Sequence, residues 1–286
     1  MKIGLYTGDL KRTDADSLFA KMAKYGFEST QFSFASVTEA DFEPNGQIEI
    51  PAKIDDEVIT LINNSAKKHN VEIVACSGTF NMAHPDFKVR DEGIKRFEIL
   101  LKAVQKLNCK VVSLNSGTRC KEHLWTYHPE NTSSEAWADM IDTLKKCAET
   151  AEKYKIIMAV ETEAATVIDT PEKARQMMNE IKSENLKMIM DCANLFHEGE
   201  AKKENVKKFI DHAFNIFGND IVLAHGKDIA ESDGIKFCPT GEGIVDYRQF
   251  IELLNKYNYK GDIILHGIFD ENKMAHAYQT IKNVMI

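Results

Sequence analysis

Four side chains that can bind a metal ion or move a proton stand at the ends of short apolar segments. In chain order, these segments end in Glu161, Asp191, His225 and His266. Carboxylate and imidazole groups are common ligands of divalent ions such as Mn²⁺, Co²⁺, Zn²⁺ and Mg²⁺. The four residues therefore predict a divalent-metal site, provided that the fold brings the four segment ends together.

Each of the four residues has a simpler interpretation when it is taken alone. A carboxylate after a strand commonly caps the next helix, and a histidine there is commonly a hydrogen-bonded rim residue. The combination favours a metal, because two neighbouring carboxylates without a counter-charge are costly and a bound cation relieves that cost.

The elements that must position these residues are short strands separated by longer amphipathic segments. Runs that are almost wholly apolar in the middle indicate strands buried on both faces of a parallel sheet. We expect eight strands, at residues 2–6, 29–34, 71–76, 110–115, 156–161, 186–191, 221–225 and 262–266.

Helices are expected between these strands. Apolar residues recur at spacings of three and four within residues 94–107, 137–151 and 206–217, which is typical of one buried helix face. Thr132 with Glu135 three residues later predicts a capping box, and Thr170 followed by Pro171 predicts another helix start. The longer connections at about 34–55 and 115–134 are expected to be loops.

Eight strands alternating with helices favour a single-domain (β/α)₈ barrel over residues 1–286. Functional residues of such barrels lie at the C-terminal ends of the strands, where all four candidates stand. An open doubly wound sheet is the alternative. No G-x-G-x-x-G follows an expected strand and no G-x-x-x-x-G-K-[ST] occurs, which disfavours nucleotide binding.

Composition and charge narrow the partners. The 36 Lys and Arg residues against 44 Asp and Glu residues give a net charge of −8, which disfavours nucleic acid and anionic membrane as partners. The chain has no apolar run of about 18 residues that would predict a membrane span. The six cysteines show no C-x-x-C spacing. We therefore expect a reduced, cytoplasmic protein.

The chain resembles the xylose-isomerase-like barrels, also called the sugar phosphate isomerase/epimerase family, which are relatives of the barrel-type apurinic endonucleases. The resemblance is carried by VETEAATV at 160–167, MIMDCANLFH at 188–197, IVLAHGKDI at 221–229 and TGEGIVDYRQFIELLNKYNYKGDIILHG at 240–267. It extends over nearly the whole chain, and the last two motifs are the most specific.

The resemblance implies metal ligands at Glu161, Asp191 and His225. The family usually ends its eighth strand in a glutamate ligand, and His266 stands at that position here. An imidazole can still bind the ion, but the change alters the proton chemistry. The position three residues after Asp191, often a histidine in relatives, is Asn194, and HGKD has no match to the endonucleases' additional ligands. A three-zinc cluster and repair of DNA are therefore disfavoured.

Further polar residues follow the expected strands as candidates for substrate binding. They are His84, Arg119, His128, Asn194 and Lys227. Arginine and lysine suit a phosphate or carboxylate group, and histidine suits sugar hydroxyls. The competing interpretation for each is a solvated or structurally paired rim residue. Trp125, Tyr127 and Phe80 offer apolar faces for a sugar ring or, equally, the small core of a loop.

The resemblance implies a metal-dependent isomerase or epimerase that acts on a sugar, a sugar phosphate or a related polyol, with a homo-oligomer left open. Glu161 or Glu163 would remove a proton next to a carbonyl group, and the ion would stabilise the enediolate. If His266 binds the metal, one-base isomerisation is favoured over epimerisation. The alternatives are a dehydratase of cyclic polyols at the same site and a non-catalytic sugar-binding barrel.

Overall fold

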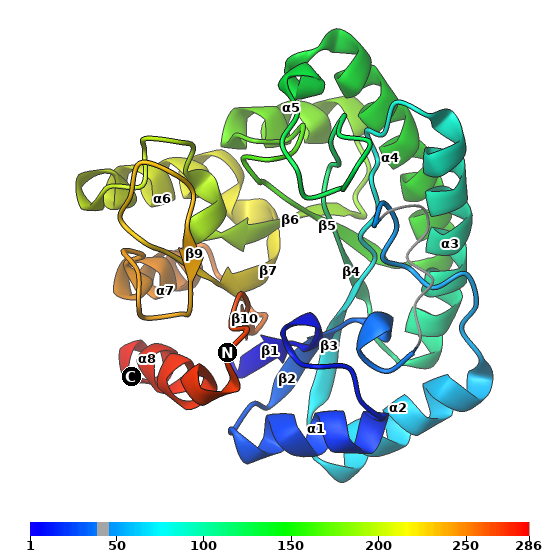
Figure 1. The fold of residues 1–286 in the computed structure, drawn as a ribbon, viewed down its shortest axis with the longest axis vertical. Coiled ribbons are helices and arrows are strands. Elements are labelled where there is room, and N and C mark those ends of the chain that lie inside the picture. Colours follow the sequence, from blue (N-terminus) through cyan, green and yellow to red (C-terminus); the bar gives the residue numbers. More distant parts are fainter. Residues whose placement is uncertain (39–45, 286) are drawn as a thin grey trace.

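In the computed structural model, which describes residues 1–38 and 46–285, eight parallel strands close into a barrel (Figure 1). The neighbours around the barrel follow the order β1-β10-β7-β6-β5-β4-β3-β2, so the first strand pairs with the last. The barrel strands are β1 (Ile3–Tyr6), β2 (Ser29–Phe32), β3 (Glu72–Ser77), β4 (Val111–Leu114), β5 (Ile157–Glu161), β6 (Leu186–Asp191), β7 (Ile221–Gly226) and β10 (Ile263–Leu265). The expected (β/α)₈ barrel is confirmed, and each strand begins and ends within two residues of its expected position.

Helices surround the barrel on the outside (Figure 1). The α-helices are α1 (Ala15–Lys24), α2 (Asp56–Lys68), α3 (Phe87–Lys106), α4 (Ser134–Tyr154), α5 (Pro171–Ile181), α6 (Lys203–Phe217), α7 (Tyr247–Lys256) and α8 (Met274–Val284). Short 3₁₀ helices are η1 (Thr7–Asp9), η2 (Phe34–Ser36), η3 (Pro129–Thr132), η4 (Cys192–Leu195), η5 (Gly218–Asp220) and η6 (Glu271–Lys273). Within the described ranges, no helix has the length and hydropathy to cross a membrane.

One of the two expected helix caps is confirmed and the other is wrong. Thr170 accepts a hydrogen bond from the Lys173 amide at the start of α5, with Pro171 as the first helical residue. At the start of α4, however, Ser133 is the N-cap and accepts from the Ala136 amide. Thr132 instead ends η3 and donates to the Pro129 carbonyl. Two adjacent hydroxyl residues compete for the cap, and the 3₁₀ turn leaves Ser133 in the extended conformation that a cap requires.

The hydrophobic core has two parts. The larger lies between the barrel and its helices and includes Phe97, Leu101, Met140, Ile210 and Phe214. The smaller fills the barrel interior and consists of Ala75, Ala159, Ile189, Leu223 and Ile264. Above this small interior cluster, at the C-terminal ends of the strands, polar side chains replace apolar ones. The barrel is therefore a closed scaffold with a polar mouth. All six cysteines are free thiols, and five of them are buried.

The loops at the C-terminal ends of the strands form the rim of this mouth. The expected loop at 115–134 contributes Trp125 to the cavity at the cluster of polar residues. Of the expected loop at 34–55, residues 39–45 lie outside the described residues. The connection from β7 to α7 contains an additional two-stranded hairpin, β8 (Asp228–Ile229) with β9 (Phe237–Cys238), which the sequence pattern did not predict.

Candidate metal centre and substrate groove

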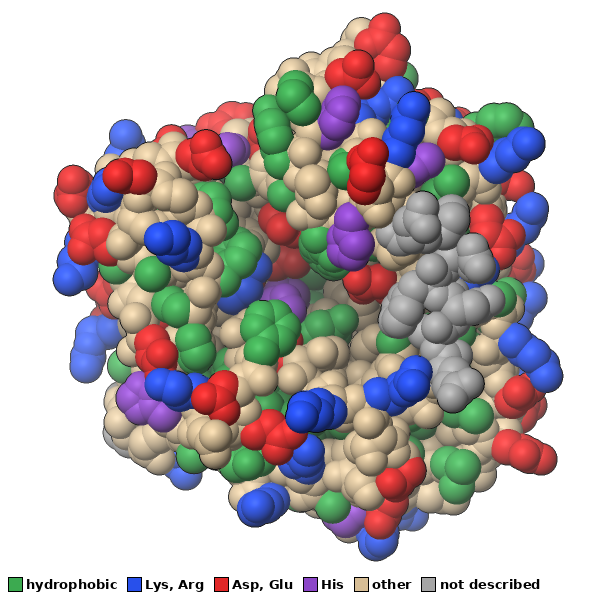
Figure 2. All heavy atoms as spheres, in the orientation of Figure 1, with side chains coloured by type: hydrophobic (Ala, Val, Ile, Leu, Met, Phe, Trp, Pro, Cys, Tyr) green, Lys and Arg blue, Asp and Glu red, His purple; other side chains and the backbone are tan. Residues whose placement is uncertain are grey.

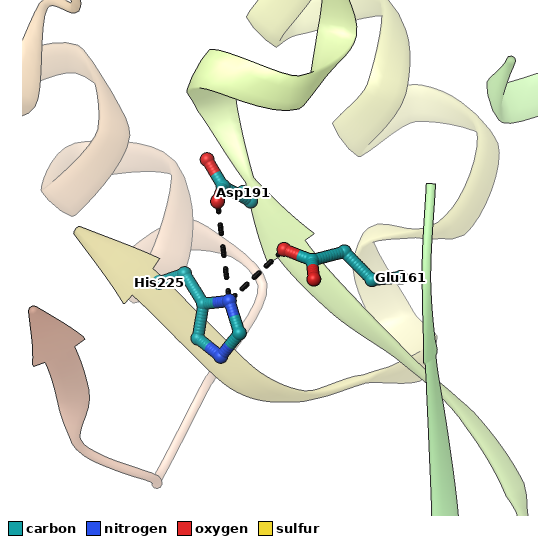
Figure 3. A group of neighbouring side chains, drawn as sticks. All are labelled: Glu161, Asp191 and His225. Atoms are coloured by element: carbon teal, nitrogen blue, oxygen red, sulfur yellow. Dashed lines mark hydrogen bonds and ion pairs between the residues drawn. The ribbon is translucent and has the colours of Figure 1, made fainter. Parts of the chain in front are cut away.

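Three strand ends place Glu161, Asp191 and His225 at one point in the barrel mouth (Figure 3). Asp191 and His225 are register partners on β6 and β7, and Glu161 is the last residue of the neighbouring strand β5. His225 Nδ1 lies 2.9 Å from Glu161 Oε1 and 3.9 Å from Asp191 Oδ2. All three side chains are buried.

The three residues fit a divalent metal ion. Each offers one ligand atom, and these atoms lie within 4.8 Å of one another. Asp191 Oδ1 accepts a hydrogen bond from the Ala193 amide, whereas the buried Oδ2 has no hydrogen-bond partner among the described residues. An unsatisfied buried carboxylate oxygen is costly unless a cation or a donor meets it. Two carboxylates and one imidazole are donors that bind such an ion in proteins.

The surroundings shift the pKa values of the two carboxyl groups in opposite directions. Burial favours the neutral form of Glu161, but the charges of His225 and Lys227 and the His225 hydrogen bond outweigh burial and lower its pKa to about 2. Burial raises the pKa of Asp191, and the nearby Lys227 ammonium, 3.7 Å from Oδ2, opposes that shift. Glu161 is therefore held ionised, while the charge of Asp191 needs a compensating cation.

The orientation of His225 is set from the opposite side of its ring. His225 Nε2 lies 2.7 Å from Gln31 Oε1, and the Gln31 amide nitrogen donates to Ser113 Oγ at 3.0 Å. Because the glutamine oxygen can only accept, a proton is assigned to Nε2. On the other side of the ring, Nδ1 donates to the ionised Glu161, and a bound ion would displace this proton and take up the Nδ1 lone pair.

The structure places His266 beside this group but not in it. His266 Nδ1 lies 3.2 Å from Asp9 Oδ1, and the second Asp9 oxygen accepts from the Ile268 amide. Burial would lower the pKa of His266, but the charge and hydrogen bond of Asp9 outweigh burial and raise it. The ring lines the same narrow cavity as Glu161 and His225. Metal ligation by His266 stays a prediction.

Glu163, two residues after the end of β5, lies on a different wall. It is partly exposed and lines a wider groove beside the narrow cavity. Burial raises its pKa to about 7. A carboxyl group with this pKa exchanges its proton near neutral pH, unlike Glu161.

Two other predicted site residues also lie in the mouth. Lys227 is buried, and its ammonium lies 3.7 Å from the centre of the Phe237 ring. Burial opposes the charge of Lys227, but the carboxylates of Asp191, Glu163 and Glu161 outweigh burial and raise its pKa. Asn194 is buried in the wall of the wider groove, and neither its amide oxygen nor its nitrogen has a described partner.

The remaining three predicted residues are engaged elsewhere and are absent from the described linings of both the cavity and the groove. Arg119 donates to Asp139 Oδ2 at 2.6 Å and to the Ala83 carbonyl at 3.1 Å. His84 accepts from the Asp86 amide, and His128 accepts from the Glu130 amide at the start of η3. All three side chains hydrogen-bond to other groups of the protein, and substrate binding by them stays a prediction.

Sequence reasoning missed three residues of the mouth. They are Asp9, which holds His266, Gln31, which holds His225, and Asn115, whose buried amide lines the narrow cavity without a described partner. One signal was available for Asn115, because this polar residue directly follows the mostly apolar strand β4, whereas Gln31 stands among other polar residues in β2 and gave no such signal.

A buried carboxylate fixes the loop that follows β7. Asp228 accepts hydrogen bonds from the backbone amides of Gly241, Gly243 and Val245 as well as from Ile229. A Cβ atom on Gly243 would collide with the Asp228 carboxylate, so this position requires glycine. The segment between β8 and β9 is thereby anchored at its base while its tip reaches the groove.

Comparisons with known proteins agree with this architecture. The family model described as xylose isomerase-like TIM barrel matches residues 19–284. The inosose dehydratase of Glaesserella parasuis is 22% identical over 70% of this chain and 72% of its own length. Among solved structures, a D-tagatose 3-epimerase-like protein has a TM-score of 0.75 at 20% identity, covering 100% of this chain and 97% of that one. The IOLI protein with a bound zinc atom has a TM-score of 0.70 at 17% identity, covering 100% and 96%.

The two solved structures support the fold. The family match spans most of the chain, including the three strand ends that carry Glu161, Asp191 and His225. The chain belongs to the xylose isomerase-like TIM barrel family.

Proposed function

We propose that the chain is a divalent-metal-dependent enzyme that removes a proton next to the carbonyl group of a polyhydroxylated compound. The observation that carries this proposal is the buried group of Glu161, Asp191 and His225 with the unpartnered Asp191 Oδ2. These three residues would hold the ion. When bound, the ion would position adjacent substrate oxygens and stabilise negative charge that develops on them.

Glu163 is the residue that we assign to proton removal. It lies on the groove wall beside the metal group without belonging to it, so its carboxyl group is available to a substrate carbon while Glu161, Asp191 and His225 hold the ion. Glu161, with a pKa near 2 and a hydrogen bond to His225, is better suited to holding a cation. This assignment selects one of the two bases that the sequence left open.

His266 supplies a proton donor in the same mouth. Its Nδ1 contacts Asp9, and the ring lines the cavity with Glu161 and His225. A protonated imidazole there can donate to a hydroxyl group that leaves from the carbon next to the deprotonated one. Glu163 takes the carbon-bound proton, a carbon–carbon double bond forms, the carbon–oxygen bond breaks, and the hydroxyl departs as water with the proton of His266.

We therefore favour dehydration, the activity that names the inosose dehydratase relative, as the reaction. The resemblance placed isomerisation or epimerisation first, and the premise that His266 is a metal ligand favoured isomerisation over epimerisation only. The contact of His266 with Asp9 weakens that premise. Isomerisation or epimerisation remains the second candidate, because Glu163 and His266 could also remove and return a proton. The intact group of three ligands argues against a non-catalytic barrel.

Turnover in D₂O separates these reactions. Protein loaded with Mn²⁺ is incubated with an inosose, with D-fructose and with D-tagatose, and the products are followed by NMR and by ultraviolet absorbance. Dehydration gives an unsaturated ketone from the inosose. An aldose or a C3-inverted ketose carrying deuterium would transfer the assignment to isomerisation or epimerisation. Glu163→Gln should reduce any of these rates by about 10²–10⁴-fold, and an unchanged rate would remove Glu163 from the reaction.

A further inference from the structure

A groove opens beside the narrow cavity at the metal group, and it is much the larger of the two. The cavity lined by Glu161, His225 and His266 has a volume of about 40 Å³, whereas the groove has about 650 Å³. Trp125 lines both. Figure 2 shows this face of the molecule hollowed at its centre. Pockets of about 300–1,000 Å³ hold ligands larger than a single small ring. The reacting end of a substrate can therefore lie in the narrow cavity while the rest of the substrate lies in the groove.

Exposed aromatic side chains gather on the walls of the groove. Trp125 and Tyr127 stand on one wall with exposed fractions of 38% and 55%, and Phe237 stands on the hairpin with 41%. Large apolar side chains that share one concave surface mark a binding site more often than chance exposure does. Their flat faces suit the face of a ring.

Two of these aromatic rings are held in place by polar contacts. The Trp125 indole nitrogen donates to Glu49 Oε1 at 2.8 Å, and the Lys227 ammonium lies 3.7 Å from the centre of the Phe237 ring. Rings that are already oriented lose less freedom when a ligand binds. The groove is thus arranged before its ligand arrives.

A buried amide offers polar contacts inside this apolar surface. Asn194 is 2% exposed, lines the groove, and leaves both its amide oxygen and its amide nitrogen without a partner among the described residues. A buried amide with no partner is costly. One donor and one acceptor would be satisfied by a ligand that carries hydroxyl or ether oxygens.

The charges around the groove exclude a phosphate group. Its lining includes Glu163 and Glu198 and, among the described residues, no lysine or arginine; its histidine, His197, is paired with Asp169 and Glu200. Lys227 behind Phe237 already faces Asp191, and Arg119 is paired with Asp139. Phosphate recognition uses arginine or lysine that can approach the anion.

From these observations we infer that the groove binds an uncharged ring linked to the reacting polyol, so that the substrate is a neutral glycoside or a similarly ring-substituted polyhydroxy ketone. This inference rests on the proposed function for the position of the reacting carbonyl group. The ring lies between Trp125 and Phe237, and Asn194 hydrogen-bonds hydroxyl or ether oxygens of the ligand.

Calorimetric titration of the Mn²⁺-loaded protein tests the inference without requiring turnover. The probes are phenyl α- and β-D-glucopyranoside, D-glucose and D-glucose 6-phosphate. We expect the better phenyl glucoside to bind about tenfold tighter than D-glucose, which corresponds to one aromatic stacking contact, and D-glucose 6-phosphate to gain nothing over D-glucose. Phe237→Ala should remove most of this advantage, whereas Asn194→Ala should weaken the binding of D-glucose and of its phenyl glucosides alike, because the phenyl ring carries no oxygen for the amide to bond.

Phe269→Ala is the matched control, because Phe269 is an exposed aromatic residue that is absent from the described groove lining. Ile235→Ala, on the same hairpin, serves as a second groove variant. Metal content measured in every variant shows that the ligand group is intact. The inference is overturned if D-glucose 6-phosphate binds tightest, or if the phenyl advantage is absent or survives in both hairpin variants. Dehydration of an inosose without a phenyl advantage would reject the inference alone, whereas a phenyl advantage without turnover of any ketone would reject only the proposed reaction.

Discussion

The His225 ring and the Gln31 side chain meet across the interior of the barrel, with Nε2 and Oε1 2.7 Å apart. Strands β2 and β7 carry these residues and are separated by β1 and β10 in the barrel order. The contact therefore spans the mouth. By holding Nε2, Gln31 directs Nδ1 of the same ring toward Glu161 and Asp191. Outer partners of this kind orient a ligand and raise its basicity.

Gln31→Leu should weaken metal binding by about 10–100-fold, because the imidazole loses the acceptor that selects its tautomer. The affinity for Mn²⁺ or Zn²⁺ is measured by competition with a coloured chelator, and circular dichroism verifies the fold. Ser113→Ala, which removes only the next partner in the chain of contacts, should have a smaller effect. Equal affinities of wild type and Gln31→Leu would show that the contact does not orient a ligand.

Asp191→Asn should abolish metal retention and leave the fold intact. The amide keeps an acceptor for the Ala193 amide, and the replaced oxygen has no hydrogen bond to lose, only the ion pair with Lys227. Burial and Glu161 disfavour the ionised aspartate whereas Lys227 favours it, so the neutral side chain should leave stability close to that of wild type in the presence of chelator. Elemental analysis and thermal unfolding measure the two properties. Full metal content in the variant would remove Asp191 from the site.

Arg119→Ala should lower stability and leave sugar binding unchanged. Its guanidinium joins Asp139 to the Ala83 carbonyl, and Arg90 reaches the other oxygen of the same aspartate. Loss of these partly buried contacts should cost about 1.5–3 kcal/mol of unfolding free energy, measured by urea denaturation. A selective loss of affinity for a sugar phosphate, with stability preserved, would restore the substrate-binding role that the sequence suggested for Arg119.

The stabilising contribution of His197 should depend on pH. A hydrogen bond with Asp169 and the charges of Asp169 and Glu200 raise the pKa of His197. The contribution is therefore fully present below the unfolded value of about 6.5 and is lost as the pH rises through the raised folded value. The His197 side chain is 37% exposed, so solvent screening limits the effect to below about 1 kcal/mol.

Urea denaturation at pH 6 and pH 9 measures this dependence. His197→Gln should be less stable than wild type at pH 6 and nearly equal to it at pH 9. A difference that is constant between the two values would mean that the protonated state of His197 does not stabilise the fold.

The sequence was sufficient for the parts of the fold that local pattern determines. Strands buried on both faces require apolar runs, so the barrel and the strand ends at Glu161, Asp191 and His225 could be predicted. The positions of Gln31 and Asp9 could not, because their partners lie 194 and 257 residues away and only the closed barrel brings them together. The cap at Ser133 was missed for a local reason, since two neighbouring hydroxyl residues match the same pattern.

Because Asp228 anchors the β7–α7 connection, the residues that hold the metal and the residues that line the groove can evolve under different constraints. The barrel strands, which carry the three ligand residues, must stay fixed for the metal group to form. The hairpin, which carries Ile235 and Phe237, is joined to them at a base that one carboxylate and the glycines around it secure, and its tip also contacts the β6–α6 connection through Ser232 and Asp233. Ile235, which faces the groove, can therefore vary in size and polarity without moving His225. The barrel can therefore keep the same metal group while the β8–β9 hairpin changes in sequence, so that substrate preference can evolve through the hairpin.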